Sequence, residues 1–347
     1  MLRLSWERPE VYFETRPEYP ERCEFHYVAD TPVFQDLRVF TGNSHPELAE
    51  SICGYMEMPI GQAEVFEFSN ENIFVRFCEN VWARDVYIVQ TMTSPVNTRI
   101  MELFIMIDAA RRASAGRITA VVPYYPYGRS DKKDQPRVPI TARLIANFLE
   151  TAGADRLLTV DLHAGQIQGF FNIPVDELTA LTLLSEYFKK KRIPNLAVVA
   201  TDVGGAKGAR RMADRLDAPL AIVEKRRLGN EEKVEALTII GDVDGCAVLI
   251  VDDEVLTAST LVTTAETVME HGATAVYAAA THPILSSDAV AKIEKSVIRE
   301  IVFTDTIPIP PEKKLPKMTV LSVAPMLGEA IWRIHTGQSV GALFNGH

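Results

Sequence analysis

Two adjacent carboxylates, Asp252 and Asp253, directly follow the apolar run CAVLIV, and residue types suited to binding phosphate come soon after them. Two carboxylates at a strand end can accept hydrogen bonds from a vicinal diol or hold a cation. Four small residues follow at the expected start of a helix: Thr257, Ala258, Ser259 and Thr260. Backbone N–H groups at a helix start bind phosphate, so the segment indicates a sugar phosphate site. The alternative is an acidic turn with a Thr/Ser cap.

Two basic segments each follow an apolar run. In the first, EKRRLGNEEK (224–233), the cations are Lys225, Arg226 and Arg227. The second, PYGRSDKKDQPR (126–137), has its own basic residues, and Tyr124, Tyr125 and Tyr127 lie near them in the sequence. Such charge runs are most often solvated surface. In an acidic protein that acts on a polyphosphate, cations on a closing loop can instead neutralise the charge of phosphoryl transfer. Aromatic and basic residues together also suit a purine nucleotide.

Further polar residues follow other apolar runs. Asp202 precedes three closely spaced glycines in TDVGGAKG, a pattern that is neither a dinucleotide-binding nor a Walker A motif. Asp161 and His163 are a weak ligand set, so any ion there is expected to be Mg²⁺ held largely by substrate phosphates. For His282 and Asp305, which belong to no richer cluster, we expect structural roles.

The elements that must position these residues alternate between strands and helices. Buried strands are expected at 85–90, 117–125, 156–162, 196–202, 246–253, 275–282 and 300–306, and helices at 99–116, 140–153 and 259–272. Alternation with unbroken apolar strands predicts parallel sheets covered by helices on both faces. Ligands bind such sheets at the carboxyl ends of the strands, where the residues above lie.

The chain of 347 residues is long enough for about two domains. We expect an N-terminal arm (1–35) rich in aromatic residues and proline, two α/β domains (36–179 and 180–335) and a C-terminal tail (336–347). With 36 basic and 46 acidic residues, the net charge of −10 argues against nucleic acid as a partner. Four scattered cysteines and the lack of a long apolar run predict a cytoplasmic protein without a membrane partner.

With these segments in hand, the sequence from about Val39 to Phe344 resembles the ribose-phosphate pyrophosphokinases. The stretch DLHAGQIQGFFNIPVD is highly specific for that family, and RRASAGRITAVVPYYPYGRSD, RVPITA, TDVGG, EKRR, IIGDV and ATHPILS occur in the same order. The resemblance implies two related type I phosphoribosyltransferase-like domains in a homo-oligomer, based on dimers and usually hexameric. It also implies transfer of the β,γ-diphosphoryl group of ATP to the C1 hydroxyl of ribose 5-phosphate.

The resemblance assigns roles position by position. Lys225 and Arg227 match the catalytic pair, and His163 and Asp202 match positions associated with Mg²⁺. The ATP-binding regions correspond to Phe68, Asn70, Asn72, Arg129, Ser130 and Asp131. The ribose 5-phosphate loop corresponds to Asp252, Asp253, Leu256, Thr257, Ala258, Ser259 and Thr260.

The sequence departs from the family pattern at the substrate loops. The usual DDxxDTGGT reads DDEVLTAST, so Leu256 replaces a sugar-binding acid and Ala258 and Ser259 replace glycines. Glu254 is expected to point differently from the missing acid. The usual FSDGE reads FSNEN, so Asn70 and Asn72 replace acids, and Ser130 stands where Gln is frequent. Ala and Ser are tolerable in the phosphate turn if φ stays negative.

Three interpretations follow. The favoured one is an active ribose-phosphate diphosphokinase. The second is a catalytically weak homologue that regulates an active partner, and the third is a diphosphokinase with a changed acceptor. Activity of the chain alone and a screen of acceptors distinguish them.

Overall fold

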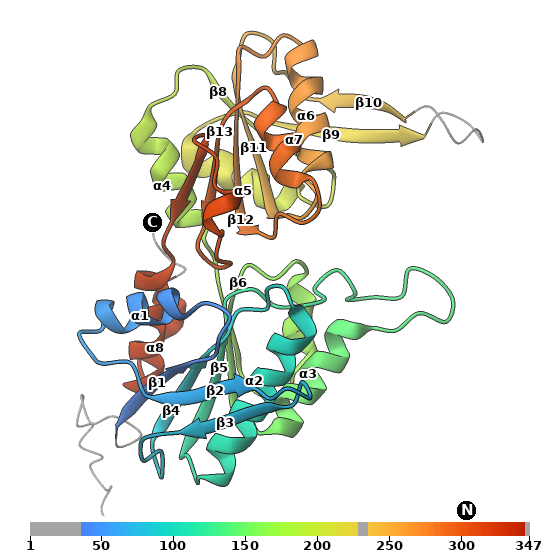
Figure 1. Ribbon diagram of the computed structural model, residues 1–347. Coiled ribbons are helices and arrows are strands. Elements are labelled where there is room, and N and C mark those ends of the chain that lie inside the picture. The colour runs from blue at the N-terminus through green and yellow to red at the C-terminus, as the bar shows by residue number, and fades with distance from the viewer. Residues whose placement is uncertain (1–35, 228–234, 344–347) are drawn as a thin grey trace, which may run out of the picture. The chain divides into compact units, whose positions relative to one another are not determined.

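The computed structural model describes residues 36–227 and 235–343. Within these ranges the chain builds two separate α/β sheets and a short antiparallel hairpin (Figure 1). The arm expected at 1–35 lies outside the described residues. No helix in the described ranges is long and apolar enough to span a membrane.

The first sheet is entirely parallel, with strand order β1-β4-β5-β6-β7. Its strands are β1 (Leu37–Thr41), β4 (Asp85–Val89), β5 (Arg117–Val122), β6 (Arg156–Val160) and β7 (Val175–Leu178). All five residues of β4 are buried, as expected for a central strand covered on both faces. The accompanying helices are α1 (Pro46–Tyr55), α2 (Val96–Arg112) and α3 (Thr141–Ala152), and the 3₁₀ helix η1 (Gly165–Phe170) follows β6.

The second sheet has strand order β10-β9-β8-β11-β12-β13-β14 and is parallel except for the β9–β10 pair. Its strands are β8 (Leu196–Ala200), β9 (Leu220–Arg227), β10 (Glu235–Ile240), β11 (Ala247–Val255), β12 (Ala275–Pro283), β13 (Ile298–Thr304) and β14 (Met318–Leu321). Its helices are α4 (Leu181–Lys191), α5 (Ala206–Leu216), α6 (Ser259–Glu270) and α7 (Ala289–Lys295). Because β8 and β11 are neighbours, the polar residues that follow them meet at one edge.

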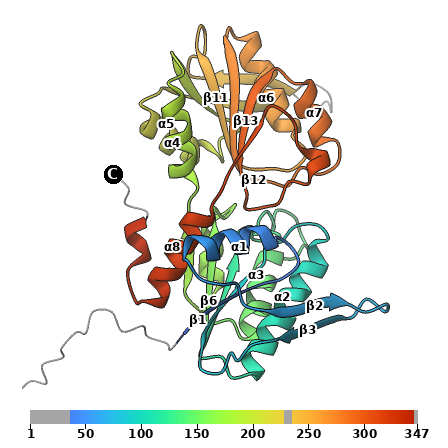
Figure 2. The same cartoon turned by 60° about the vertical axis from the view of Figure 1, so that its left-hand side comes forward.

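The last long helix, α8 (Ala324–His335), packs against α1 near the start of the chain (Figure 2). A Cβ atom at Gly328 would come within 2.6 Å of the Tyr55 ring, so glycine permits this close approach. His335 Nδ1 lies 2.9 Å from Asp85 Oδ2, and Arg117 donates to the Ile334 carbonyl. The domain boundaries at 179 and 335 stay a prediction. Helix α8, which those boundaries assign to the second domain, contacts elements of the first.

The seven strands and three helices expected from the apolar runs are all present, with ends shifted by a few residues. The two-sheet α/β fold is therefore confirmed. The sequence patterns gave no expectation for the hairpin of β2 (Ala63–Glu67) and β3 (Ile73–Phe77) or for the β9–β10 ribbon. The hairpin strands are only partly buried, so they lack the continuous apolar run that marks a central strand.

Candidate active site

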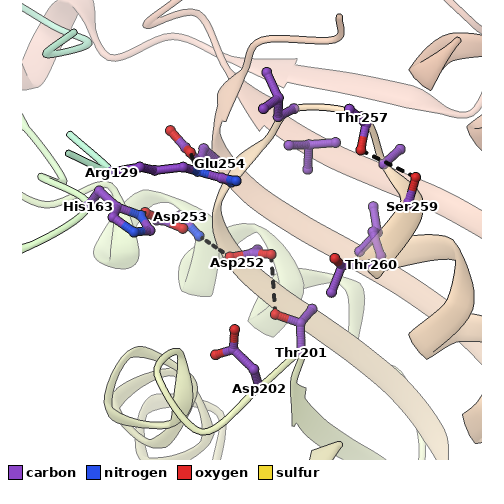
Figure 3. A pocket seen from close by; sticks show the side chains of 14 residues that line it. Arg129, His163, Thr201, Asp202, Asp252, Asp253, Glu254, Thr257, Ser259 and Thr260 are labelled. Atoms are coloured by element: carbon purple, nitrogen blue, oxygen red, sulfur yellow. Dashed lines mark hydrogen bonds and ion pairs between the residues drawn. The ribbon is translucent and has the colours of Figure 1, made fainter. Parts of the chain in front are cut away.

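A cavity of about 340 Å³ opens where β8 and β11 end (Figure 3). It gathers all of the residues expected to bind ribose 5-phosphate and metal, together with Arg129 of the expected ATP site. The expected residues that line it are Arg129, His163, Asp202, Asp252, Asp253, Leu256, Thr257, Ala258, Ser259 and Thr260. Thr201, Val255, Leu261 and Glu254 complete the lining and were not expected there.

Asp252 and Asp253 form the most strongly perturbed acidic pair of the cavity. Burial raises the pKa of Asp252 to about 8, and the neighbouring Asp253 charge adds to this rise. Burial also opposes ionisation of Asp253, but its 2.6 Å contact with His163 Nδ1 outweighs that effect and holds the Asp253 pKa low. The same contact raises the pKa of His163. Both oxygens of Asp252 accept hydrogen bonds, from the Thr201 hydroxyl at 3.3 Å and from the Asp253 N–H at 3.0 Å. The acidic pair thus presents two adjacent carboxyl groups to the cavity.

Arg129 and Glu254 form an ion pair at the mouth of the cavity. Arg129 comes from the loop after β5, and Glu254 lies near the end of β11. The hydroxyl of Tyr124 donates to the second carboxylate oxygen of Glu254 at 3.0 Å. Glu254 itself lines the cavity, so the expectation that it points differently from the missing acid stays a prediction. What the sequence did not show was its partners, because they lie 125 and 130 positions away.

The helix α6 begins at Ser259, six residues after Asp253, and its first residues line the same cavity. The N–H groups of a first helical turn have no partner within the helix. Ala258 stands at its N-cap with φ +58°, in the left-handed region. The condition of a negative φ therefore fails at Ala258 and holds at Ser259, which is helical. The hydroxyl of Ser259 contacts Thr257 at 3.3 Å and accepts a 3.0 Å hydrogen bond from Lys292 of α7. No sequence pattern had singled out Lys292.

Asp202 caps the turn that leads into α5, accepting a 2.8 Å hydrogen bond from the backbone N–H of Gly205. A Cβ atom at Gly204 would lie 3.1 Å from that same carboxylate, so the glycine gives it room. Asp202, Asp252 and Asp253 thus supply carboxylate oxygens to one cavity. Among the described residues, however, no three His, Cys, Asp or Glu side chains converge as a metal cluster. This donor set suits a hard cation that takes most of its ligands from phosphate and water.

Comparison with known proteins decides the family. Residues 37–153 match the N-terminal domain of ribose phosphate pyrophosphokinase, and residues 228–345 match the phosphoribosyl synthetase-associated domain. The ribose-phosphate pyrophosphokinase of Caldanaerobacter subterraneus is 49% identical over 309 residues, covering 89% of this chain and 98% of its own. That of Bacillus subtilis is 46% identical over 311 residues, covering 90% and 98%. The chain belongs to the ribose-phosphate pyrophosphokinase family.

A solved structure from the same family has a similar fold. The crystal structure of phosphoribosylpyrophosphate synthetase from Mycobacterium smegmatis superimposes with a TM-score of 0.83 at 40% sequence identity. The match covers 86% of this chain and 99% of that one. The match therefore extends over both sheets of the pyrophosphokinase fold, and the family expectation drawn from the motifs is confirmed.

Three of the residues expected at the pyrophosphokinase ATP site lie outside the cavity. Phe68, Asn70 and Asn72 occupy the turn between β2 and β3. The Phe68 ring packs edge-on to Phe66 and is half exposed, and the Asn72 N–H donates to the Asn70 side chain at 3.3 Å. These contacts hold the turn and leave Phe68 with an exposed aromatic face.

Ser130 and Asp131 likewise do not line the cavity. Ser130 Oγ accepts a hydrogen bond from the N–H of Thr141, the first residue of α3. Asp131 is buried and accepts a hydrogen bond from Gln166. Within the described residues, the two side chains thus position the backbone that carries Arg129.

Lys225 and Arg227 lie at the end of β9, on an edge that β10 pairs antiparallel. Only their backbone is described, so their catalytic role remains a prediction. His282 and Asp305 have the structural roles expected of them. His282 is buried and contacts Thr306 and the Asp161 carbonyl, and Asp305 accepts a hydrogen bond from the N–H of Val323 at the start of α8.

Proposed function

We propose that this chain binds ribose 5-phosphate in the cavity at the ends of β8 and β11 and transfers the β,γ-diphosphoryl group of ATP to it. In this reaction the C1 hydroxyl oxygen attacks the β-phosphorus and loses its proton. The bond from the β-phosphorus to the oxygen bridging to the α-phosphate breaks, and AMP leaves. The activity is that of the family to which the chain belongs.

One observation carries the assignment of the site: the acidic pair and the start of α6 line the same cavity. Asp252 and Asp253 offer two adjacent carboxyl groups to two neighbouring ribose hydroxyls. The N–H groups and hydroxyls of residues 257–260 lie a few residues further along the same segment, where the 5-phosphate would bind. Fixing both ends of the sugar supplies the orientation that an in-line displacement requires.

The nucleotide is assigned to the residues that the family resemblance indicates. Arg129 would contact its phosphates from the cavity, with Phe68, Asn70, Asn72, Ser130 and Asp131 forming or supporting the rest of the ATP site. Lys225 and Arg227 would approach the transferring group from the end of β9. Cations there stabilise the charge that develops on the equatorial oxygens and on the leaving group.

Mg²⁺ is the cation that this donor set suits. His163 and Asp202 would hold it, directly or through water, beside the carboxylates of the acidic pair. When bound, Mg²⁺ neutralises phosphate charge and polarises the phosphoryl group. Addition of excess EDTA is therefore expected to abolish AMP formation, and added Mg²⁺ is expected to restore it.

The first experiment measures AMP release from ATP with Mg²⁺ and ribose 5-phosphate, for the intact chain and for Lys225→Ala. We expect release that falls at least 100-fold in the variant, because a phosphate-clamping cation contributes that much to phosphoryl transfer. A matched control is Lys189→Ala, which removes an exposed cation of α4 outside the cavity lining and should leave AMP release unchanged. Absence of release by the wild-type chain with nucleotide still bound would favour the regulatory homologue.

A changed acceptor is the second candidate, and Leu256 favours it. Its side chain lines the cavity at the position where the family usually has a sugar-binding acid. A less hydroxylated or bulkier acceptor would contact leucine without leaving a hydroxyl unpaired. In Leu256→Asp, the KM for ribose 5-phosphate is expected to fall about tenfold. A screen of phosphorylated acceptors with the wild-type chain gives the opposite test, since a better acceptor than ribose 5-phosphate would support the second candidate.

The chain is also proposed to act in the cytoplasm as a homo-oligomer, based on dimers and hexameric as is usual in the family. Scattered cysteines without a pairing pattern support the reducing compartment. Light scattering of the full chain and of a chain lacking residues 1–35 tests the assembly. If the full chain is a monomer, the proposed assembly is contradicted. If the shortened chain keeps the same number of subunits, an assembly role for the arm is contradicted.

A further inference from the structure

Glu254 is a buried carboxylate at the cavity to which neither the reaction nor the family resemblance assigns a role. Only 5% of the residue is exposed, and its two oxygens have different partners. One pairs with Arg129 Nε, and Figure 3 shows these two side chains together. The other accepts a hydrogen bond from the Tyr124 hydroxyl. We propose that Glu254 is a positioning residue that fixes the Arg129 guanidinium for the nucleotide phosphates. This proposal rests on the proposed ATP site.

The two partners account for both oxygens of the carboxylate. The recorded hydrogen bonds of Glu254 thus go to Arg129 and Tyr124, and not to the neighbouring acids. Its neighbours Asp252 and Asp253 contact other groups, Thr201 and His163. The strand end thus carries three acids with separate partners, two beside the sugar site and one directed at the arginine.

The pair holds Arg129 without using all of its donors. The contact is made through Nε, while a guanidinium has five N–H donors in a rigid plane. The Arg129 side chain is 54% exposed, against 4% for that of Glu254. Arg129 thus lines the cavity with more than half of its side chain exposed, while the buried Glu254 holds its Nε. A guanidinium held in this way loses less conformational freedom when it binds a phosphate, and so binds it more tightly.

Tyr124 makes the arrangement more rigid. Burial raises the pKa of its hydroxyl far above the ordinary value, so it remains a donor at any pH at which the chain is assayed. It fixes the second oxygen of Glu254, and its ring lies 4.9 Å from that of His282. The carboxylate cannot rotate away from Arg129 without losing this bond.

The test is a double-mutant cycle on nucleotide affinity. Binding of α,β-methylene-ATP, in which the bridge broken by the reaction is a carbon, is measured by calorimetry for wild type, Glu254→Gln, Arg129→Gln and the double variant. Glu254→Gln is expected to weaken binding about tenfold, the size of a lost charged hydrogen bond. The double variant is expected to match Arg129→Gln within twofold. Additive losses would overturn the proposal.

Kinetics separate positioning from a general structural role. In Glu254→Gln the KM for ATP should rise about tenfold, while the KM for ribose 5-phosphate changes less than twofold. Asp85→Asn breaks another buried carboxylate–arginine pair, outside the lining of this cavity, and should leave both KM values unchanged. Equal rises of both KM values in Glu254→Gln would contradict the proposal.

Two further results keep the test decisive. If Glu254→Gln does not fold, Tyr124→Phe keeps both charges and removes only the hydroxyl, so a rise of about threefold in the KM for ATP alone is expected. No rise in that variant would count against the arrangement. Nucleotide affinity is measured without turnover, so a wild-type chain that binds the analogue but transfers nothing would refute the proposed reaction and not the role of Glu254.

Discussion

Ala258 has a left-handed backbone at the start of the proposed phosphate loop, with φ +58° and ψ 2°. An L-residue with a Cβ atom pays about 1 kcal/mol for this conformation, whereas glycine does not. The strain lies between the acidic pair and the first N–H groups of α6, so it is located where the loop turns toward the cavity. The turn thus places an alanine in a conformation that favours glycine.

Replacing Ala258 by glycine should stabilise the chain. We expect Ala258→Gly to raise the free energy of unfolding by about 0.5 to 1 kcal/mol, because it relieves the left-handed strain. Urea denaturation followed by circular dichroism measures the change. The matched control is Ala265→Gly in the interior of α6, which should lower stability by about 1 kcal/mol or more. A fall in stability at position 258 would show that the loop is not strained.

Helix α8 is joined to the first sheet by a buried polar network as well as by apolar contacts. Asp85 of β4 is fully buried and contacts both Arg117 and His335. Burial alone would raise the pKa of Asp85, but hydrogen bonds from His335 and Arg117 outweigh it and lower the pKa. Arg117 also donates to the Ile334 carbonyl, so one ionised carboxylate links strand and helix.

The pH dependence of stability should reflect this network. A carboxylate whose pKa is lowered by folding stabilises the folded state above its unfolded pKa of about 4, and the effect is lost as pH falls further. Asp85→Asn should therefore cost about 3 kcal/mol at pH 7, and its difference from wild type should shrink below about pH 4. Urea midpoints from pH 7 to pH 3 measure this. A difference that stays constant would contradict the assignment.

At the scale of the whole molecule, the C-terminal helix α8 contacts helix α1 of the first sheet. After the second sheet, α8 packs against α1, and one cluster of buried side chains includes Leu48 and Ile52 of α1 with Leu327 and Ile331 of α8. Burial of each such side chain contributes about 1.5 to 3 kcal/mol. The sum is comparable with the net stability of about 5 to 15 kcal/mol that is usual for a protein, so the first sheet depends on the C-terminal helix.

Truncation tests this dependence. A chain ending at Ser322 should lose hydrogen-exchange protection in β1 and α1, because the surface that α8 covers becomes exposed. A chain ending at Thr336 keeps α8 and serves as the control, with protection close to that of the full chain. Unchanged protection in the shorter chain would show that the first sheet is stable by itself.

The sequence by itself determined the central strands, three of the helices and most of the proposed site. Unbroken apolar runs mark central strands such as β4 and β11. Polar residues after a parallel strand must lie at its carboxyl end, so Asp202 and Asp252 could be predicted to lie at the ligand-binding edge of a sheet. Family motifs added His163 and Arg129, which also line the cavity. Each of these predictions depends on local pattern or on the fixed geometry of parallel sheets.

Only the tertiary structure decided the partners of these residues. Glu254 meets Arg129 and Tyr124, His335 meets Asp85, and Ser259 meets Lys292, across separations that range from 33 to 250 positions. Such pairings depend on how strands are ordered and how helices pack, and no local pattern encodes them. The positive φ of Ala258 was also decided by the tertiary structure. The turn imposes it, whereas an alanine by itself avoids the left-handed region. The sequence thus determined which groups are present, and packing determined which of them meet.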